Sequence, residues 1–124
     1  MPARLRPADP AAVADARGRF EAARAEGASA DKVDLRLLVK HYLALLEARA
    51  PGRSVEVRVP PYAAVQVVEG VRHTRGTPPA VIETDAETWI ALATGALTWP
   101  EAAGSSKVRA SGERADLAPY LPLG

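Results

Sequence analysis

Apolar residues recur at helical spacing in two segments of the first third of the chain. The first segment begins at Asp9 and Pro10, residue types preferred at the start of a helix, and ends before Gly27, a typical helix-stop residue. Its apolar stripe is narrow and consists of Val13, Ala16, Phe20 and Ala23. The pattern therefore predicts an amphipathic helix that buries one thin face.

Residues 31–49 form a stronger helical pattern, which Ser29 or Asp31 can cap and which Pro51 and Gly52 end. Its apolar positions cover a wide arc: Leu35, Leu38, Val39, Tyr42, Leu45 and Leu46. An arc of this width predicts contact with two elements at once, such as a sheet and another helix. The alternative is that one flank faces a cavity or a second chain.

After residue 52 the apolar period changes to two, which is typical of half-buried strands. Val55, Val57 and Val59 alternate with Glu56 and Arg58. The same reasoning predicts four strands in all, at residues 54–59, 63–68, 80–84 and 107–111. The second strand is expected to be an antiparallel neighbour of the first.

The segment TGALTWPEA, residues 94–102, joins two further predicted helices. Asp85, or the threonine before it, suits the N-cap of the first helix, and Gly95 suits its left-handed stop. Thr98 followed by Glu101 has the capping-box form and opens a short second helix that ends at residue 103. The chain is expected to turn sharply here, and the side chain of Trp99 is expected to pack across the joint between the two helices.

These elements predict one α+β domain that spans residues 1–124. Residues 1–50 form a helical hairpin, and residues 51–124 form a sheet with two short crossing helices and a C-terminal helix. The sheet is expected to be mostly antiparallel and four- to five-stranded, with helices packed on one face. A chain of 124 residues has enough length to bury about two thirds of its unfolded surface.

Composition limits the classes of function that the chain can have. The formal net charge of +1 gives no whole-chain argument for nucleic acid, and the absence of cysteine excludes disulfides, thiolate zinc sites and cysteine nucleophiles. No apolar run approaches the roughly 20 residues that span a bilayer. The N-terminal stretch MPARLRPADP lacks the apolar core of a signal peptide, so a cytoplasmic location is expected.

Candidate chemistry in the sequence is sparse. His41 lies on the polar edge of its helix, where solvent exposure or a local hydrogen bond is expected, and His73 is far from it in sequence. No catalytic motif, metal-ligand set or cofactor motif is present. Arg72 and Arg75 are either part of a solvated loop or a clamp for an anionic head group.

Several of these segments together resemble a known family. From residue 80 to residue 123, the strand, the Asp-capped helix with ATGALTWPEA, the strand SSKVRASG and the segment with Asp116 and Leu117 resemble the C-terminal half of the sterol carrier protein (type-two) domain. With KHYLALLEARAPGRSVEVRVPPYAAVQ added, the chain is similar to the small actinobacterial sterol carrier family proteins.

The resemblance implies an apolar cavity between the sheet and the helices, which binds lipids or other hydrophobic small molecules without a cofactor or a catalytic group. The cavity-lining candidates are Leu38, Tyr42, Leu45, Val57, Val67, Val81, Trp89, Leu92, Val108, Leu117, Tyr120 and Leu121. The leading hypothesis is a non-enzymatic carrier, with peripheral membrane contact left open. The alternative is a protein-interaction or homodimerisation module with a filled cavity, akin to accessory domains of mycothiol-dependent enzymes.

Overall fold

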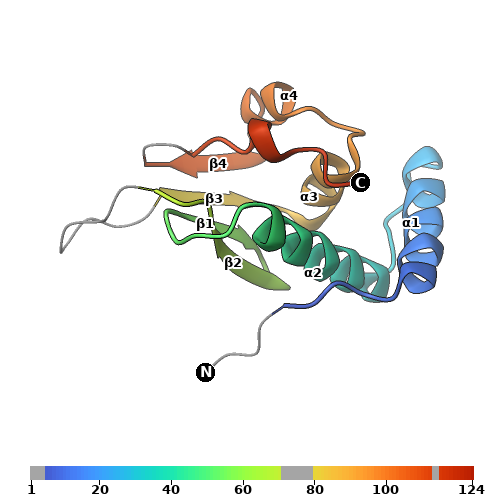
Figure 1. The fold of residues 1–124 in the computed structure, drawn as a ribbon. Helices are drawn as coiled ribbons and strands as arrows, with labels where there is room; N and C mark the ends of the chain where they lie inside the picture. The colour runs from blue at the N-terminus through green and yellow to red at the C-terminus, as the bar shows by residue number, and fades with distance from the viewer. Residues whose placement is uncertain (1–4, 71–79, 113–114) are drawn as a thin grey trace.

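The structure, a computed structural model, describes residues 5–70, 80–112 and 115–124. The elements in these residues are α1 (Pro10–Ala25), α2 (Lys32–Arg49), β1 (Val55–Val59), β2 (Ala63–Val67), β3 (Ala80–Thr84), α3 (Ala86–Thr94), α4 (Trp99–Ala103), β4 (Val108–Ser111) and the 3₁₀ turn η1 (Ala118–Tyr120). Their order and approximate bounds confirm the sequence prediction (Figure 1). The C-terminal helix is reduced to the single turn η1.

The four strands form one sheet in the order β2-β1-β3-β4. The outer pairs, β1 with β2 and β3 with β4, are antiparallel, whereas the central pair of β1 and β3 is parallel. The sheet is therefore mixed. After the β1–β2 hairpin the chain returns to the other side of β1, and this return sets β3 parallel to β1.

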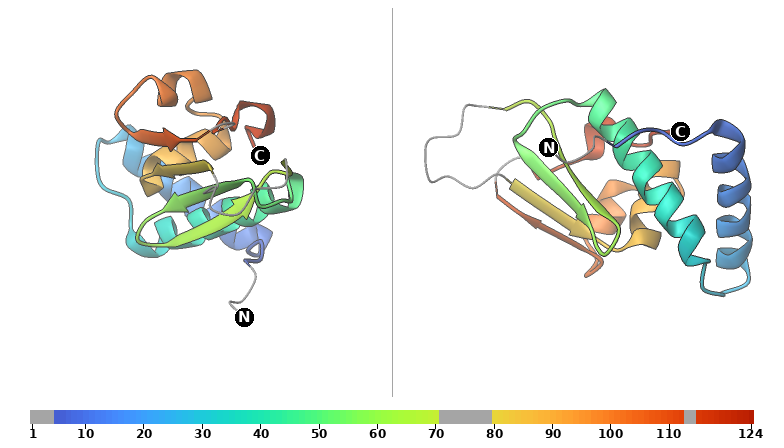
Figure 2. Two further views of the ribbon diagram at one scale, coloured as in Figure 1. Left: turned by 90° about the vertical axis from the view of Figure 1, so that its left-hand side faces the viewer. Right: turned by 90° about the horizontal axis from the view of Figure 1, so that it is seen from below.

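One face of this sheet is covered and the other is open. Val55, Val57 and Val59 of β1 are fully buried, as is Ile82 of β3, while Arg58 on the opposite face is exposed. The helices α2 and α3 pack on the covered face, and α1 lies outside α2 (Figure 2). The predicted one-sided packing of helices is thus present, because alternate strand residues carry the apolar side chains.

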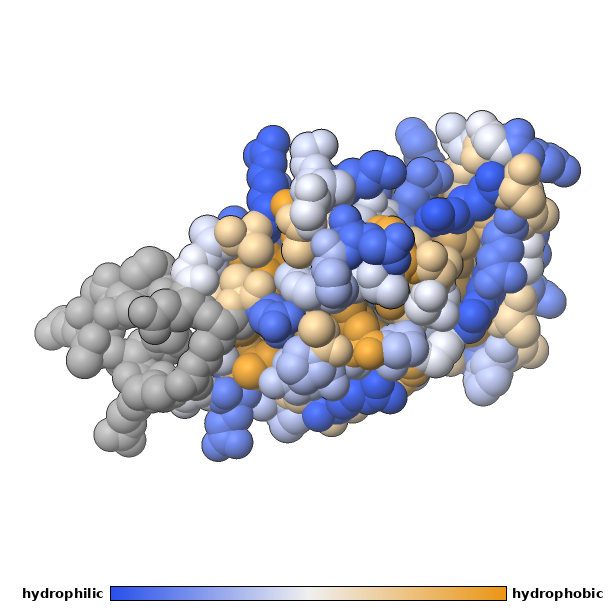
Figure 3. Space-filling model, turned by 90° about the horizontal axis from the view of Figure 1, so that it is seen from above, coloured by the Kyte–Doolittle hydropathy of each residue, from blue (hydrophilic) through white to orange (hydrophobic). Residues whose placement is uncertain are grey.

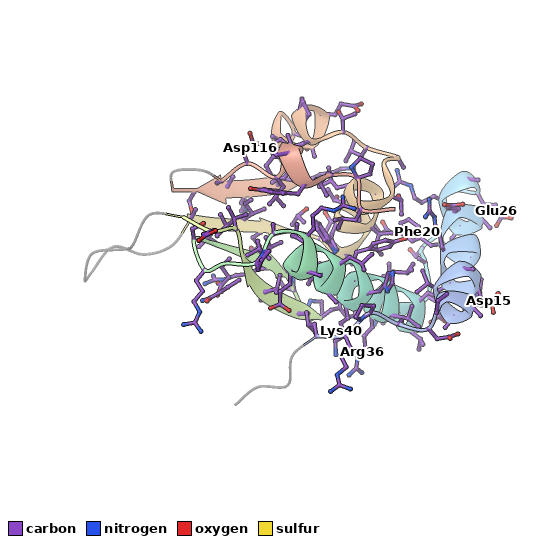
Figure 4. The ribbon with its side chains drawn as sticks, in the orientation of Figure 1. Asp15, Phe20, Glu26, Arg36, Lys40 and Asp116 are labelled. Atoms are coloured by element: carbon purple, nitrogen blue, oxygen red, sulfur yellow. The ribbon has the colours of Figure 1, made fainter. Side chains whose placement is uncertain are left out.

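The helical hairpin of α1 and α2 combines a small apolar contact with an ion pair between an exposed arginine and a buried aspartate. Asp9 and Asp31 cap the two helices, as the sequence predicted. Phe20 of α1 is buried and points toward the rest of the domain (Figure 4). Arg19 of α1 donates two hydrogen bonds, of 2.9 and 3.0 Å, to the carboxylate of Asp34 on α2, which is only 6% exposed. No pattern in the sequence indicates that Asp34 is buried.

The junction between α2 and β1 is tightly packed around Val68. The Val68 amide donates to the Ala50 carbonyl, and the Val68 carbonyl accepts from both the amide and the hydroxyl of Ser54. A Cβ atom on Gly52 would lie 2.2 Å from the carbonyl atoms of Val68, so only glycine fits here. The end of β2 is thereby fastened to the start of β1.

Candidate functional site

The helix α3 lies at the centre of the fold. Asp85 caps it by accepting hydrogen bonds from the Thr88 amide and hydroxyl, each 2.8 Å long. All of its residues from Thr88 to Ala93 are buried. The helix ends at Gly95, whose φ of 87° is left-handed, as the sequence predicted.

The joint between α3 and α4 is held by hydrogen bonds within the chain. The amide and hydroxyl of Thr98 donate to Glu101 Oε1 at 3.1 and 2.7 Å, and the Glu101 amide donates to Thr98 Oγ1 at 3.4 Å. These bonds from Thr98 hold the pKa of Glu101 below its ordinary value because they stabilise the carboxylate. The predicted capping box is therefore present, and it opens α4, whose Ala102 is buried in the core.

The C-terminal segment, residues 117–124, lies against this joint. The Leu123 amide donates to the Ala93 carbonyl at 2.7 Å, which satisfies a carbonyl in the last turn of α3. Arg49 at the end of α2 donates to the carbonyls of Tyr120 and Pro122 at 3.0 and 2.7 Å. Arg17 of α1 donates to the Gly124 oxygen at 2.7 Å, so polar contacts from three helices fix the position of the segment.

Between the joint and the C-terminal segment lies a pocket of about 260 Å³, which we call the joint pocket. Its lining is mainly apolar and consists of Leu92, Gly95, Leu97, Thr98, Trp99, Pro100, Ala118, Leu121 and Pro122. Leu92 is buried, whereas Trp99 and Leu121 are half-buried and reachable from solvent. Small apolar areas lie between polar ones on the molecular face that carries α4 (Figure 3).

The joint pocket is suited to apolar groups and offers no group for acid–base chemistry. None of the described residues that line it carries a titratable side chain. Its one side-chain hydroxyl, that of Thr98, is already engaged in the capping box. The arrangement can therefore bury hydrocarbon surface, and it has no nucleophile, acid or base directed at a ligand.

A family model described as bacterial SCP ortholog matches residues 31–123, from the cap of α2 to the C-terminal segment. The chain belongs to this sterol carrier protein-like family. No curated protein matches the chain significantly. The helix α1 precedes the matched residues, so the sterol-carrier-like match begins where α2 begins.

Most of the cavity-lining candidates lie together in one apolar cluster of this sterol carrier-like domain. The candidates that are buried in this cluster are Leu38, Tyr42, Val57, Val67, Trp89, Leu92, Val108 and Leu117. Leu45, Tyr120 and Leu121 are half-buried at its margin, and of all the candidates Leu92 and Leu121 line the joint pocket. Val81 lies elsewhere, because strand alternation places it on the open face beside Glu56.

The remaining candidates do not extend the site. Arg72 and Arg75, the candidate head-group clamp, lie outside the described residues, as does His73. Within the described residues there is no group of three or more side chains that could hold a metal ion. The helices of the described part include none with the length and apolar character of a membrane span.

Sequence reasoning missed two parts of the site. Leu97 and Pro122 line the joint pocket although they are far apart in sequence, and no local pattern indicates that they meet. No sequence pattern singles out Arg49, yet its side chain holds the C-terminal segment in place. Trp99 was expected at the joint, and the structure adds that its half-buried side chain lines a pocket.

Proposed function

We propose that this chain is a non-enzymatic binding and carrier module for a lipid or another apolar small molecule, with the joint pocket receiving one end of the ligand. The observation that carries the proposal is an apolar, solvent-reachable pocket without a titratable lining residue. Membership of a sterol carrier protein-like family supports a hydrophobic ligand. At a site of this kind the favourable free energy of binding comes mainly from removing apolar surface from water.

The size of the joint pocket limits what it can hold alone. A volume of 260 Å³ accommodates about eight or nine methylene-sized groups, at roughly 30 Å³ each. Burying them contributes about 6–7 kcal/mol, against an association cost of about 4 kcal/mol or more. The net 2–3 kcal/mol corresponds to a dissociation constant on the order of 10 mM. A carrier with micromolar affinity must therefore bury about seven further methylene groups beyond this pocket.

A chain-length series tests this reasoning. In the Trp89→Phe variant the protein retains Trp99 as its one tryptophan, so fluorescence reports on the joint pocket. Straight-chain carboxylates of six to sixteen carbons should bind about fourfold more tightly per added methylene, and the gain should continue beyond nine carbons. A plateau at nine carbons with millimolar affinity would contradict a carrier function.

Two matched variants locate the binding site. Ala118→Phe fills the joint pocket, whereas Ala103→Phe adds the same apolar group to an exposed position of α4 outside it. The first should abolish the ligand-dependent rise in melting temperature, and the second should keep it. If no chain length changes the Trp99 emission or the melting temperature, the proposal fails and a protein-interaction module takes its place.

A further inference from the structure

The N-terminal segment, residues 5–9, lies against the rest of the domain before α1 begins. It passes beneath α2 in Figure 1, and the view from below in Figure 2 shows it crossing α2 before it reaches α1. Leu5 is half-buried and packs against the apolar cluster, and Ala8 is half-buried as well. The helix α2 therefore has α1 along one part of its surface and this extended segment along another.

One hydrogen bond between backbone and side chain joins the segment to α2. The Ala8 amide donates to Nδ1 of His41 at 3.0 Å. An imidazole nitrogen can accept only while it carries no proton, so this bond requires neutral His41. The His41 ring also lies edge-on to the ring of Tyr42, with centroids 4.9 Å apart. Protonation of Nδ1 would set two N–H donors against each other.

The surroundings of His41 do not favour its charged form. Burial lowers the pKa of His41 below its ordinary value of 6.5. The cations Arg36 and Lys40 extend from α2 on the side along which the segment runs (Figure 4), and the segment itself contributes Arg6. The carboxylate of the segment, Asp9, accepts from the Ala12 amide at the start of α1.

Among the other elements packed against α2, α1 brings the cation Arg17 to the hydroxyl of Tyr42, the ring that lies against His41. The helix α3 carries Glu87 in its first turn. The start of α1 and the whole of β2 carry no titratable side chain. The first five residues of α1 are PAAVA, and β2, which packs against α2, is AAVQV. A lowered folded-state pKa means that neutral His41 stabilises the attached segment at pH values above about 6.5. That stabilisation is lost as the pH falls through 6.5 toward the lower value, because the released form binds the proton more readily.

We propose that the N-terminal segment is a pH-released strap, which neutral His41 holds on α2 and which mildly acidic conditions detach. Release uncovers a surface of α2 that is already formed. Leu37 and Leu45 lie one helical turn on either side of His41, at the four-residue spacing that places side chains on one face, and both are half-buried. Acid would therefore expose an apolar stripe beside Arg36 and Lys40 without unfolding the helix.

Backbone relaxation by NMR tests the strap directly. Amide order parameters of Leu5, Arg6 and Ala8 should be near 0.85 at pH 7.5 and fall below about 0.6 one pH unit under the measured His41 midpoint. The Ala93 amide in α3 should stay rigid in both conditions. If the segment remains ordered after His41 has titrated, or if His41 titrates above 6.5, the proposal is wrong.

The variant His41→Asn separates titration from the mere presence of a side chain. Its amide oxygen can accept from the Ala8 amide near the position of Nδ1 and does not titrate, so the segment should stay ordered at both pH values. His73→Asn removes the other histidine and should release the segment as the unchanged chain does. Equal loss of order in His41→Asn at low pH would overturn the assignment.

Discussion

The close approach of Gly52 to Val68 leads to the sharpest prediction about stability. In Gly52→Ala the new Cβ would lie 2.2 Å from the Val68 carbonyl carbon and oxygen, and 2.3 Å from the Glu69 nitrogen. Ordinary contact begins near 3.4 Å, so the backbone at Val68 must move by about 1 Å or more. These are backbone atoms, which cannot turn aside as a flexible side chain would.

This displacement of the Val68 backbone would also break three hydrogen bonds. They join the Val68 amide to the Ala50 carbonyl at 2.6 Å, and the Ser54 amide and hydroxyl to the Val68 carbonyl at 3.0 and 2.6 Å. At about 0.5–1.5 kcal/mol each, their loss costs roughly 3 kcal/mol. Overpacking strain adds about 1 kcal/mol or more. The free energy of unfolding should therefore fall by about 4 kcal/mol.

Urea denaturation at pH 7 measures this loss, and a second glycine provides a control of opposite sign. Gly18 lies inside α1, and a Cβ there would meet nothing within 4 Å. Gly18→Ala should raise the free energy of unfolding by about 0.5–1 kcal/mol, because alanine has the higher helix propensity. If Gly52→Ala changes the stability by less than 1 kcal/mol, the packing described around Val68 is incorrect.

Three further substitutions have expected effects on the melting curve. Asp34→Ala should lower the free energy of unfolding by about 1.5 kcal/mol or more, because it removes the carboxylate that accepts two charge-assisted hydrogen bonds from Arg19. An unchanged melting curve would mean that α1 docks on α2 without these bonds. Gly95→Val should cost about 1 kcal/mol or more through strain at a φ of 87°, and a neutral result would place the helix stop elsewhere. Thr98→Ala should lower the free energy of unfolding by about 1 kcal/mol, because it removes the N-cap of α4. Thr98→Ser keeps the capping hydroxyl and should therefore retain most of that stability.

The sequence predicts the helices and strands well because their signals are local. Asp9 and Asp31 cap helices, Gly95 ends one, and the capping box of Thr98 and Glu101 forms as expected. The parallel pairing of β1 and β3 could not be predicted in this way. Apolar alternation shows that a strand has a buried face, but it does not identify the neighbouring strand.

The site is harder to predict than the fold for the same reason. In β3 the residues Ala80, Val81 and Ile82 are all apolar, so the pattern alone does not show which of them face the helices. The structure places Val81 on the open face and Thr84 inside, where its hydroxyl donates to the Lys107 carbonyl at 2.8 Å. The joint pocket depends on the path of the C-terminal segment, which tertiary contacts determine.

The central parallel pair of strands has a consequence for how the chain folds. The β1–β2 hairpin pairs residues 4 to 12 positions apart, whereas β1 and β3 pair residues 25 positions apart and β3 and β4 pair residues 24 to 30 apart, so the hairpin alone among these pairings can form from local contacts. Among the described strands, the β1–β3 seam, which pairs Val55 with Ala80, joins the hairpin to the rest of the sheet. Since non-local pairing is slow, the pairing of β3 with both of its neighbours should limit the folding rate. Substitutions in β3 should then slow folding, whereas those at the α3–α4 joint should mainly speed unfolding.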